Sequence, residues 1–380
     1  MRASSIAVSL FLSAAALAAP PSGARSARPD RVTRYLGTRG LARVEVQNPI
    51  INADFADPAV LRADGHFFLY ATQSKVGKKM VNIQVARTRD MKGIEHLGDA
   101  LPEKPSWASK TQDFWAPHVV RAPRSLGSGK YLMYFVAKPD PEYVKTHGTA
   151  DGMAMGVAIS DSPQGPFKDS GKPLLVSPGF QAIDPMVLEE GEHRILYWGS
   201  NSKPIKAQSL SADGLTFEKG SAAKEVLFTD ENRPFERLLE APWVVKKDGK
   251  YVMFASGDNC CGENAHYGVV IASASSPFGP FAKIDTTKGS GVVLQGNDLA
   301  HTQKPRFTNP GHNAMFEDAT GRLFNLAGSI DSQDPSQAGS GYSRRVLVLD
   351  RVHWKNGVPH FKEGTVANGP QPGPAFEEAR

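Results

Sequence analysis

Short apolar runs separated by polar turns recur along the chain. Five stretches show the pattern most clearly: DPAVLRADGHFFLYATQS from Asp57, APHVVRAPRSLGSGKYLMYFVA from Ala116, DPMVLEEGEHRILYWGS from Asp184, APWVVKKDGKYVMFAS from Ala241 and HNAMFEDATGRLFNLAGS from His312. Each has a short apolar segment, a polar turn that usually holds glycine, and a second segment rich in aromatic residues. This order is typical of a β-hairpin. The starts lie roughly 57 to 71 residues apart, a spacing that indicates repeated supersecondary units.

The part that follows each hairpin also recurs. VAISDSPQGPF at 157–167 resembles IASASSPFGPF at 271–281, and QVARTRDM and KAQSLSADGLTF look like diverged copies of the same strand and turn. Each unit is therefore predicted to hold a hairpin and about two more strands. Four-stranded units repeated around an axis form a β-propeller, so the pattern predicts an all-β, five-bladed propeller in a single domain. The alternative is a β-sandwich with accidental hairpin similarity, which would not explain why the turns and the charged positions recur together.

The two ends of the chain differ from the repeats. The start, MRASSIAVSLFLSAAALAAPPSG, has an early arginine, an apolar run and small residues before a cleavage point. This predicts a signal peptide at 1–18 and a secreted, extracellular protein. A membrane anchor is the alternative, but the apolar run is shorter than the roughly 20 residues that a spanning helix needs. Residues 19–46 are predicted to be a leader, 47–360 the propeller and catalytic domain, and 361–380 a C-terminal tail.

Composition adds two constraints. The 380 residues carry a formal net charge of +5, and the densest basic stretch, RSARPDRVTR at 25–34, lies near the N-terminus. A nucleic-acid partner is not expected, because no basic cluster is interleaved with aromatic residues. The two cysteines, Cys260 and Cys261, are neighbours. In a secreted protein they form either a vicinal disulfide that stiffens their loop or two buried thiols.

The repeat register gathers polar residues at one end of the predicted channel. Asp57 and Asp184 take the first position of their repeats, and Glu240 immediately precedes the fourth repeat. His312 begins the fifth repeat, and Trp115 precedes the second. Asp54 has no counterpart in the other repeats and is expected to be a local or turn residue.

Three carboxylates that face one cavity suit acid–base chemistry. Like charges raise one another's pKa, so one group stays protonated while another is ionised. Glycoside hydrolysis needs this division between a proton donor and a base that activates water. Two alternatives bear on these acids. An aspartate before proline often caps a turn, and oxygen ligands suit calcium, although the chain has no dense D-x-D-x-D loop. No G-x-S-x-G supports a nucleophilic serine.

The blocks NADFADPAVLRADGHFFLYAT, DFWAPHVV, AIDPMVLEEGEHRILYWGS, LEAPWVVKKDGKYVMFASGDNCCG and NPGHNAMFED resemble glycoside hydrolase family 43 in order and kind. They extend over nearly all of residues 47–360. The resemblance implies a five-bladed propeller and an inverting enzyme that acts on polysaccharides containing arabinose or xylose. By matching motif, Asp57 would be the general base, Asp184 would orient the acid and tune its pKa, and Glu240 would be the general acid.

The same resemblance implies roles for three other residues. Trp115 would form an apolar wall for a sugar ring, and Arg345 would reach the sugar site, with its neighbour Arg344 as the alternative. His312 would lie near the channel axis beside a structural calcium or sodium ion; a hydrogen-bonded structural histidine is the alternative. No cofactor is expected for the chemistry. The chain departs from the family at GVP (357–359), where members often have GWP.

The sequence thus predicts a secreted inverting hydrolase of α-L-arabinofuranosyl linkages, above all the α-1,5 linkages of arabinan. Its expected partner is plant cell-wall polysaccharide, arabinan or arabinoxylan, or their oligosaccharides. Three alternatives stay open: a β-xylosidase, a sugar-binding propeller without catalysis, and a retaining fructan-type propeller, whose usual NDPNG-like start is replaced here by ADPAV.

Overall fold

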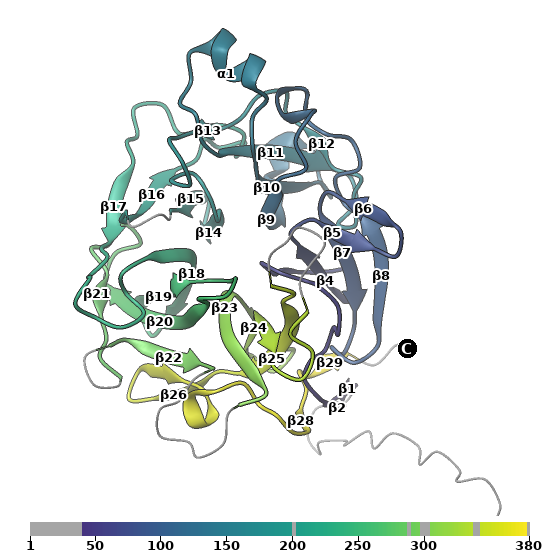
Figure 1. Cartoon of the computed structure of the whole chain (residues 1–380), viewed down its shortest axis with the longest axis vertical. Coiled ribbons are helices and arrows are strands. Elements are labelled where there is room, and N and C mark those ends of the chain that lie inside the picture. Colours follow the sequence, from purple (N-terminus) through teal and green to yellow (C-terminus); the bar gives the residue numbers. More distant parts are fainter. Residues whose placement is uncertain (1–39, 200–202, 287–289, 297–304, 337–342, 378–380) are drawn as a thin grey trace, which may run out of the picture. The chain divides into compact units, whose positions relative to one another are not determined.

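The computed structural model describes residues 40–199, 203–286, 290–296, 305–336 and 343–377. The predicted signal peptide lies outside these residues. The described chain is built almost entirely of strands, with one α-helix, α1 (Pro141–His147), in the described part. Four of the sheets have at least four strands and a fifth has three, and they are arranged around a common centre (Figure 1). The prediction of an all-β, five-bladed propeller is confirmed.

The blades follow one another along the chain, and consecutive strands within each are antiparallel. Blade 1 holds β3 (Ala59–Ala63), β4 (His66–Ala71), β7 (Gln84–Thr88) and β8 (Ile94–Asp99). Blade 2 holds β9 (Phe114–Arg121), β10 (Tyr131–Ala137), β11 (Ala154–Ser160), β12 (Lys168–Asp169) and β13 (Leu175–Val176). Blade 3 holds β14 (Met186–Glu190), β15 (His193–Trp198), β16 (Ile205–Ser209) and β17 (Lys224–Leu227). Blade 4 holds β18 (Leu239–Lys247), β19 (Lys250–Asn259), β20 (His266–Ala274), β21 (Ala282–Lys283) and β22 (Val292–Gln295). Blade 5 holds β23 (Phe307–Glu317), β24 (Leu323–Asp331) and β25 (Val346–Arg351).

The apolar core is divided among the joints between blades. One cluster of buried side chains lies between blades 1 and 2, and others lie between blades 2 and 3, 3 and 4, and 4 and 5. A further cluster joins blade 5 to blade 1, where Phe316 and Leu347 pack with Phe67 and Leu69. Because each sheet buries both faces against its neighbours, the ring is stabilised by five contacts of similar kind rather than by one central core.

The five predicted repeat starts share one backbone conformation. Asp57, Ala116, Asp184, Ala241 and His312 all have left-handed φ values, between 48° and 57°. This conformation is costly for a residue with a Cβ, by about 1–2 kcal/mol each, so a repeat of it marks a shared geometric requirement. Asp57 and Asp184 lie two residues before the innermost strands of their blades, whereas Ala116, Ala241 and His312 lie within theirs.

A second repeated contact links neighbouring blades. A tyrosine hydroxyl on the second strand of one blade donates to a backbone carbonyl in a turn of the next: Tyr70 to Pro163, Tyr134 to Gly214 and Tyr197 to Pro277. Two of these turns are the resembling segments SPQGPF and SPFGPF. They contain the cis peptides Gly165–Pro166 and Gly279–Pro280. The similarity seen in the sequence therefore reflects a common inter-blade joint.

Residues 48–55 close the ring on the outer edge of blade 5. The backbone N–H of Ile50 donates to the carbonyl of Leu347, and that of Phe55 donates to the carbonyl of Arg345. The predicted leader and tail meet nearby, because β1 (Leu41–Ala42) pairs with β29 (Phe376–Glu377) and β2 (Glu45–Val46) pairs with β28 (Gln371–Pro372). The domain boundaries at 46 and 360 stay predictions, and residues on both sides of them are held in these paired strands.

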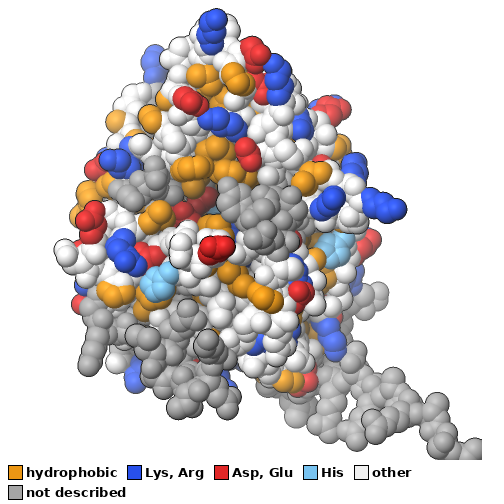
Figure 2. Space-filling view, viewed as in Figure 1, with side chains coloured by type: hydrophobic (Ala, Val, Ile, Leu, Met, Phe, Trp, Pro, Cys, Tyr) orange, Lys and Arg blue, Asp and Glu red, His pale blue; other side chains and the backbone are white. Residues whose placement is uncertain are grey.

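The remaining elements decorate the ring. They are the hairpins β5 (Ser74–Val76) with β6 (Lys79–Val81) and β26 (His353–Lys355) with β27 (Val358–His360), and the short 3-10 helices at Ser106–Ala108, Arg124–Leu126 and Lys362–Gly364. On the face shown in Figure 2, side chains of both charge signs are spread among one another rather than gathered by sign. Within the described part of the chain, no helix has the length and apolar character to cross a bilayer.

Candidate active site

One cavity of about 310 Å³ brings the predicted site residues together. Its walls come from all five blades and from the loops between them. The lining residues are Asp54, Ala56, Asp57, Thr72, Gln73, Trp115, Phe180, Ile183, Asp184, Leu238, Glu240, Asn259, Cys260, Cys261, His312, Ser343 and Arg345. All six residues singled out from the sequence are among them. A larger surface hollow, of about 800 Å³, lies at the outer ends of β18 and β23 and contains none of the six.

The blades present their lining residues in two ways. In blades 1, 3 and 5 the left-handed residue itself reaches the cavity. In blades 2 and 4 the left-handed residue is an alanine, and the residue before it, Trp115 or Glu240, lines the cavity instead. The innermost strands of blades 2, 4 and 5 all start before their left-handed residue and carry a register shift beside it. In blades 2 and 4 the residue before the alanine supplies the lining side chain, and for this reason Glu240 precedes its repeat by one residue.

Asp57 is held as an anion. Its Oδ1 lies 2.7 Å from a guanidinium nitrogen of Arg345, and its Oδ2 accepts a 2.5 Å hydrogen bond from the Thr72 hydroxyl. Burial alone would raise the pKa of Asp57, but the Arg345 charge and the Thr72 hydroxyl outweigh it, so the pKa lies below the ordinary 3.8. Thr72 Oγ1 also accepts from the backbone N–H of Ala116, at 3.0 Å, which fixes the direction of the hydroxyl. An ionised carboxylate that stays partly open to the cavity is suited to accept a proton.

Asp184 has the opposite electrostatic environment. Burial, the Glu240 carboxyl and the Asp57 carboxyl together raise the pKa of Asp184 well above its usual value. Its Oδ2 accepts a 3.0 Å hydrogen bond from the backbone N–H of Ala241, the residue after Glu240. Asp184 therefore contacts the strand that carries Glu240, and it belongs to an acid pair that favours retention of a proton.

Glu240 is more accessible than Asp184. It is half-buried in the cavity wall, whereas Asp184 is buried. Its Oε1 accepts a 2.6 Å hydrogen bond from the hydroxyl of Tyr267, a residue of β20 that is 1% exposed. Tyr267 in turn packs against the bare backbone of Gly311, where a Cβ would lie 2.1 Å from its ring. Glu240 is therefore the member of the acid pair that is held at the cavity surface.

His312 lies between the two aspartates. Its Nδ1 is 3.3 Å from Asp57 Oδ1 and 4.0 Å from Asp184 Oδ2, and its backbone N–H donates to the Ser256 hydroxyl at 2.7 Å. Burial lowers the pKa of His312 to about 4, so the ring is neutral at neutral pH. Of its two ring nitrogens, Nδ1 faces the carboxylates of Asp57 and Asp184. Among the described residues, no group of three or more His, Cys, Asp or Glu side chains is arranged to hold a metal. These residues do not fit a protein-ligated metal centre, and the calcium or sodium ion near His312 stays a prediction.

Arg345, rather than Arg344, reaches the cavity. Arg345 is 8% exposed, and its backbone N–H donates to Asp54 Oδ1 at 3.1 Å. Arg344 lies outside, 3.2 Å from Asp334 and hydrogen-bonded to Asn52. Asp54 also accepts a 2.7 Å hydrogen bond from Ser74 through its Oδ2. Asp54 therefore holds the Arg345 backbone and lines the cavity. The expectation that Asp54 is only a local or turn residue did not include these two contacts.

Aromatic side chains form another wall. Trp115 stacks on Phe180, with ring centroids 6.1 Å apart and an angle of 21° between the planes. Phe180 is 48% exposed, which is unusual for phenylalanine, and it lies in the loop between β13 and β14. The pair offers an apolar surface beside the acids, as sugar sites commonly do.

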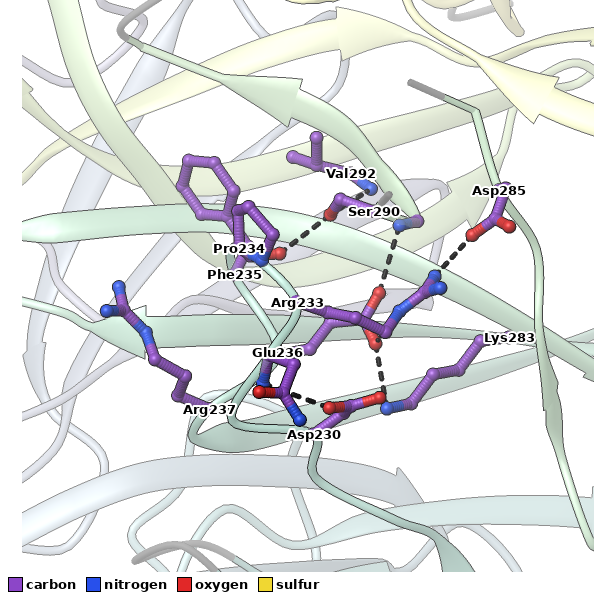
Figure 3. A network of polar contacts seen from close by, with 12 residues as sticks. Asp230, Arg233, Pro234, Phe235, Glu236, Arg237, Lys283, Asp285, Ser290 and Val292 are labelled. Carbon is purple, nitrogen blue, oxygen red and sulfur yellow. Dashed lines mark hydrogen bonds and ion pairs between the residues drawn. The ribbon is translucent and has the colours of Figure 1, made fainter. Parts of the chain in front are cut away.

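The loop that leads into β18 is fixed by a buried carboxylate. Glu236, 1% exposed, accepts from Arg233, Lys283 and the backbone N–H of Gly291 at 2.8, 2.7 and 3.0 Å (Figure 3). Figure 3 also shows Arg233 reaching Asp285 and Ser290 reaching the carbonyl of Pro234. Since Glu240 follows four residues later, this network anchors the start of the strand that carries it.

Several lining or supporting residues were not found from the sequence, among them Thr72, Tyr267, Phe180 and Ser256. Thr72 and Ser256 follow the aromatic segment of their hairpins at matching places, and both accept from the backbone of the next blade's left-handed residue. Their shared position in the repeat could have identified both residues from the sequence. Phe180 and Tyr267 carry no such repeat.

Known proteins resemble this chain over most of its length. A sequence profile of glycosyl hydrolases family 43 matches residues 46–359. A β-D-galactofuranosidase of Aspergillus niger is 30% identical over 277 residues, which cover 71% of this chain and 72% of that protein. An extracellular endo-α-(1→5)-L-arabinanase of Bacillus subtilis is 22% identical over 370 residues, which cover 84% of this chain and 74% of that protein.

A solved structure shows the same fold. The α-L-arabinanase of Cellvibrio cellulosa in complex with arabinohexaose superposes with a TM-score of 0.62 at 19% identity, covering 82% of this chain and 96% of that chain. The family profile spans nearly the whole described ring and every site residue named above. The chain therefore belongs to glycosyl hydrolases family 43.

Proposed function

We propose that this glycoside hydrolase cleaves α-L-arabinofuranosyl linkages, with the α-1,5 linkages of arabinan or its oligosaccharides as substrate, by an inverting reaction. The observation that carries the proposal is the contrast between two acids in one cavity. Asp57 is held ionised by Arg345 and Thr72, while burial and the nearby Glu240 carboxyl raise the pKa of Asp184, so that the Asp184–Glu240 pair retains a proton. An inverting glycosidase needs such a division, with an ionised base on one side and a proton held for the leaving group on the other.

In the proposed reaction, Asp57 takes a proton from a water molecule whose oxygen attacks the anomeric carbon. The glycosidic C–O bond breaks as Glu240 delivers a proton to the leaving oxygen. Asp184 is a positioning residue, because its Oδ2 fixes the backbone next to Glu240 and its carboxyl adds to the proton affinity of the pair. Arg345 holds Asp57, and Trp115 with Phe180 supports the sugar ring. No step uses an ion.

The relatives support a furanose substrate. One is named for arabinan and one for β-D-galactofuranosides. α-L-Arabinofuranose and β-D-galactofuranose share the arrangement of substituents on the five-membered ring and differ in the length of the exocyclic chain. A β-D-galactofuranosidase is therefore the second candidate, favoured by the 30% identical relative. A β-xylosidase that acts on xylan or arabinoxylan stays a third, since a xylosidase/arabinosidase of Bacteroides ovatus is also similar, 27% identical over 272 residues.

The test is an assay on linear arabinan, arabinoxylan and aryl α-L-arabinofuranoside, β-D-galactofuranoside and β-D-xyloside. Asp57→Asn and Glu240→Gln should each lower kcat on the preferred substrate by about 10²–10⁴-fold. Asp64→Asn is the matched control, because Asp64 also has a left-handed φ, of 50°, but lies exposed in the β3–β4 turn.

Proton NMR of the first-formed product should show the inverted anomer. Wild-type rates in both variants, or a retained anomer, would contradict the mechanism. A preference for the galactofuranoside or the xyloside would replace the substrate and leave the mechanism intact. Absence of hydrolysis on every substrate would leave the sugar-binding propeller as the better description.

A further inference from the structure

The cavity mouth carries a feature that the proposed reaction does not use. Cys260 and Cys261, adjacent in the chain, are joined by a disulfide bond. Both line the cavity, and both are half-buried, so the disulfide forms part of its wall. Of the two states considered from the sequence, the structure therefore has the disulfide.

A disulfide between adjacent residues does little to stabilise the fold as a whole. In the chain-entropy account, a cross-link gains its effect from the length of loop that it closes, and here the sequence separation is 1. The loop is held by other contacts. Asn259 Nδ2 donates to the carbonyls of Cys261 and Asn264, each at 3.1 Å, and the Gly262 N–H donates to the Ser343 hydroxyl at 3.0 Å.

The strand register places the disulfide outside the level of the catalytic acids. Glu240 on β18 pairs with Ser256 on β19, and Cys260 follows four residues further along the same chain direction. β19 ends at Asn259, so at about 3.3 Å per residue the strand carries the chain about 10 Å beyond the level of Glu240 before the disulfide begins. A sugar bound at the acids would have its anomeric carbon below the disulfide, and the next sugar of the chain would lie beside it.

The chemistry of this wall suits the face of a sugar ring. Disulfide sulfurs are polarisable and have no hydrogen to donate, so they pack well against C–H groups. Phe180, stacked on Trp115, lines the same cavity from the loop between blades 2 and 3, whereas the disulfide comes from blade 4. The cavity therefore has two apolar surfaces from different loops, beside the polar floor formed by Asp57, Asp184 and Glu240.

We propose that the Cys260–Cys261 disulfide and Phe180 form a second sugar-binding subsite, which holds the ring next to the one being cleaved. The proposal rests on the proposed function, because it takes a furanose oligosaccharide as the ligand. It makes the disulfide a determinant of chain-length preference, since a single sugar bound at the floor does not reach it.

The experiment compares wild type with Cys260→Ala/Cys261→Ala on linear arabino-oligosaccharides of two to five sugars. The KM for three or more sugars should rise about 5- to 20-fold with kcat nearly unchanged, as expected when binding energy common to ground and transition states is lost. The inhibition constant of free arabinose, which occupies the floor alone, should stay within about twofold because its contacts are untouched. Reduction of wild type by a phosphine, verified by mass spectrometry of the two thiols, gives the same comparison if the double variant does not fold.

The possible outcomes separate the subsite from the proposed function. An unchanged KM for the longer oligosaccharides in a folded, disulfide-free protein overturns the subsite. A parallel rise in the arabinose inhibition constant also overturns it, because the loop would then be supporting the floor. If wild type neither cleaves nor binds any furanose oligosaccharide, the proposed function fails and the subsite with it. If wild type cleaves them and the variant is identical, only the subsite fails.

Discussion

The hydroxyl of Thr72 offers the sharpest test of how the site keeps Asp57 ionised. It donates to Asp57 Oδ2 at 2.5 Å and accepts from the backbone N–H of Ala116 at 3.0 Å. Thr72→Val removes the hydroxyl and keeps the shape of the side chain, whereas Thr72→Ser keeps the hydroxyl. The pair of variants therefore separates the hydrogen bonds from the packing of the methyl group.

The size of the effect follows from the charge on the acceptor. A hydrogen bond to an ionised group is worth about 1.5–3 kcal/mol, and 1.36 kcal/mol corresponds to one pKa unit. Thr72→Val should therefore raise the pKa of Asp57 by roughly 1–2 units. Because the base must be ionised, the acid limb of kcat/KM should move to higher pH by the same amount, while Thr72→Ser should leave it in place.

Stability should change in a way that depends on pH. The folded pKa of Asp57 lies below 3.8, so this group stabilises the fold above its unfolded pKa and loses that contribution as pH falls through the folded value. Thr72→Val reduces the depression and also leaves the Ala116 N–H without its acceptor, at a cost of about 1–3 kcal/mol. Urea unfolding at pH 7 should show both losses. Below the folded pKa of Asp57 only the second loss, which does not depend on pH, should remain.

An acid limb that stays in place in a folded Thr72→Val protein would contradict this account of Asp57. In that case either the hydroxyl does not set the pKa of Asp57, or Asp57 is not the group whose ionisation limits the rate at low pH. A shift in Thr72→Ser as large as that in Thr72→Val would assign the effect to the methyl group instead.

Three further predictions concern the surroundings of the acids. Phe180→Ala should raise KM for oligosaccharides about 3- to 10-fold. It should change the free energy of unfolding by less than about 0.5 kcal/mol, because the side chain is 48% exposed. A lower melting temperature with an unchanged KM would contradict a binding role. Gly311→Ala should displace Tyr267, because the new Cβ would lie 2.1 Å from the ring, and should destabilise the fold by about 1–3 kcal/mol with loss of activity. Gly328 pairs with Gly311 across the strands, and Gly328→Ala should be tolerated because its Cβ would lie 3.5 Å from the nearest atom. Equal loss of stability in the two variants, measured by denaturation, would contradict the packing argument. Glu236→Ala should cost about 3–5 kcal/mol in urea unfolding, since it leaves Arg233 and Lys283 without their buried partner. Glu225→Ala should cost almost nothing, because Glu225 of β17 is exposed. Similar small losses in both variants would show that the network adds little to stability.

The repeat pattern was enough to predict the blades because it reports a backbone requirement. The five starts that were aligned by their apolar runs all have a left-handed φ, and the two SP-x-GPF segments are two inter-blade turns with cis peptides. The fifth blade departs from the prediction of about four strands: within the described residues its sheet has three, and residues 48–55 run along its edge. That pairing joins segments far apart in the chain, which local alternation cannot show.

Site residues whose positions recur in the repeats could be predicted from the sequence, and site residues without a counterpart in the repeats could not. Asp57, Asp184 and Glu240 were found because their positions recur. Asp54 was set aside because it has no counterpart, yet a ring has only one closing joint, so a residue that works there cannot recur. Tyr267 lies on a third strand, where an aromatic residue reads as core, and only the fold shows its hydroxyl against Glu240.

The closing joint of the ring also passes through the active site. Asp54 and Arg345, 291 positions apart, meet where the first blade joins the last, and Arg345 supplies the charge that keeps Asp57 ionised. In the proposed mechanism, a chain whose last blade has not docked therefore lacks a working base even if its other blades are complete. Activity would then require that folding has brought Arg345 of the last blade to the first, and a break at this one joint would silence the enzyme before the rest of the ring came apart.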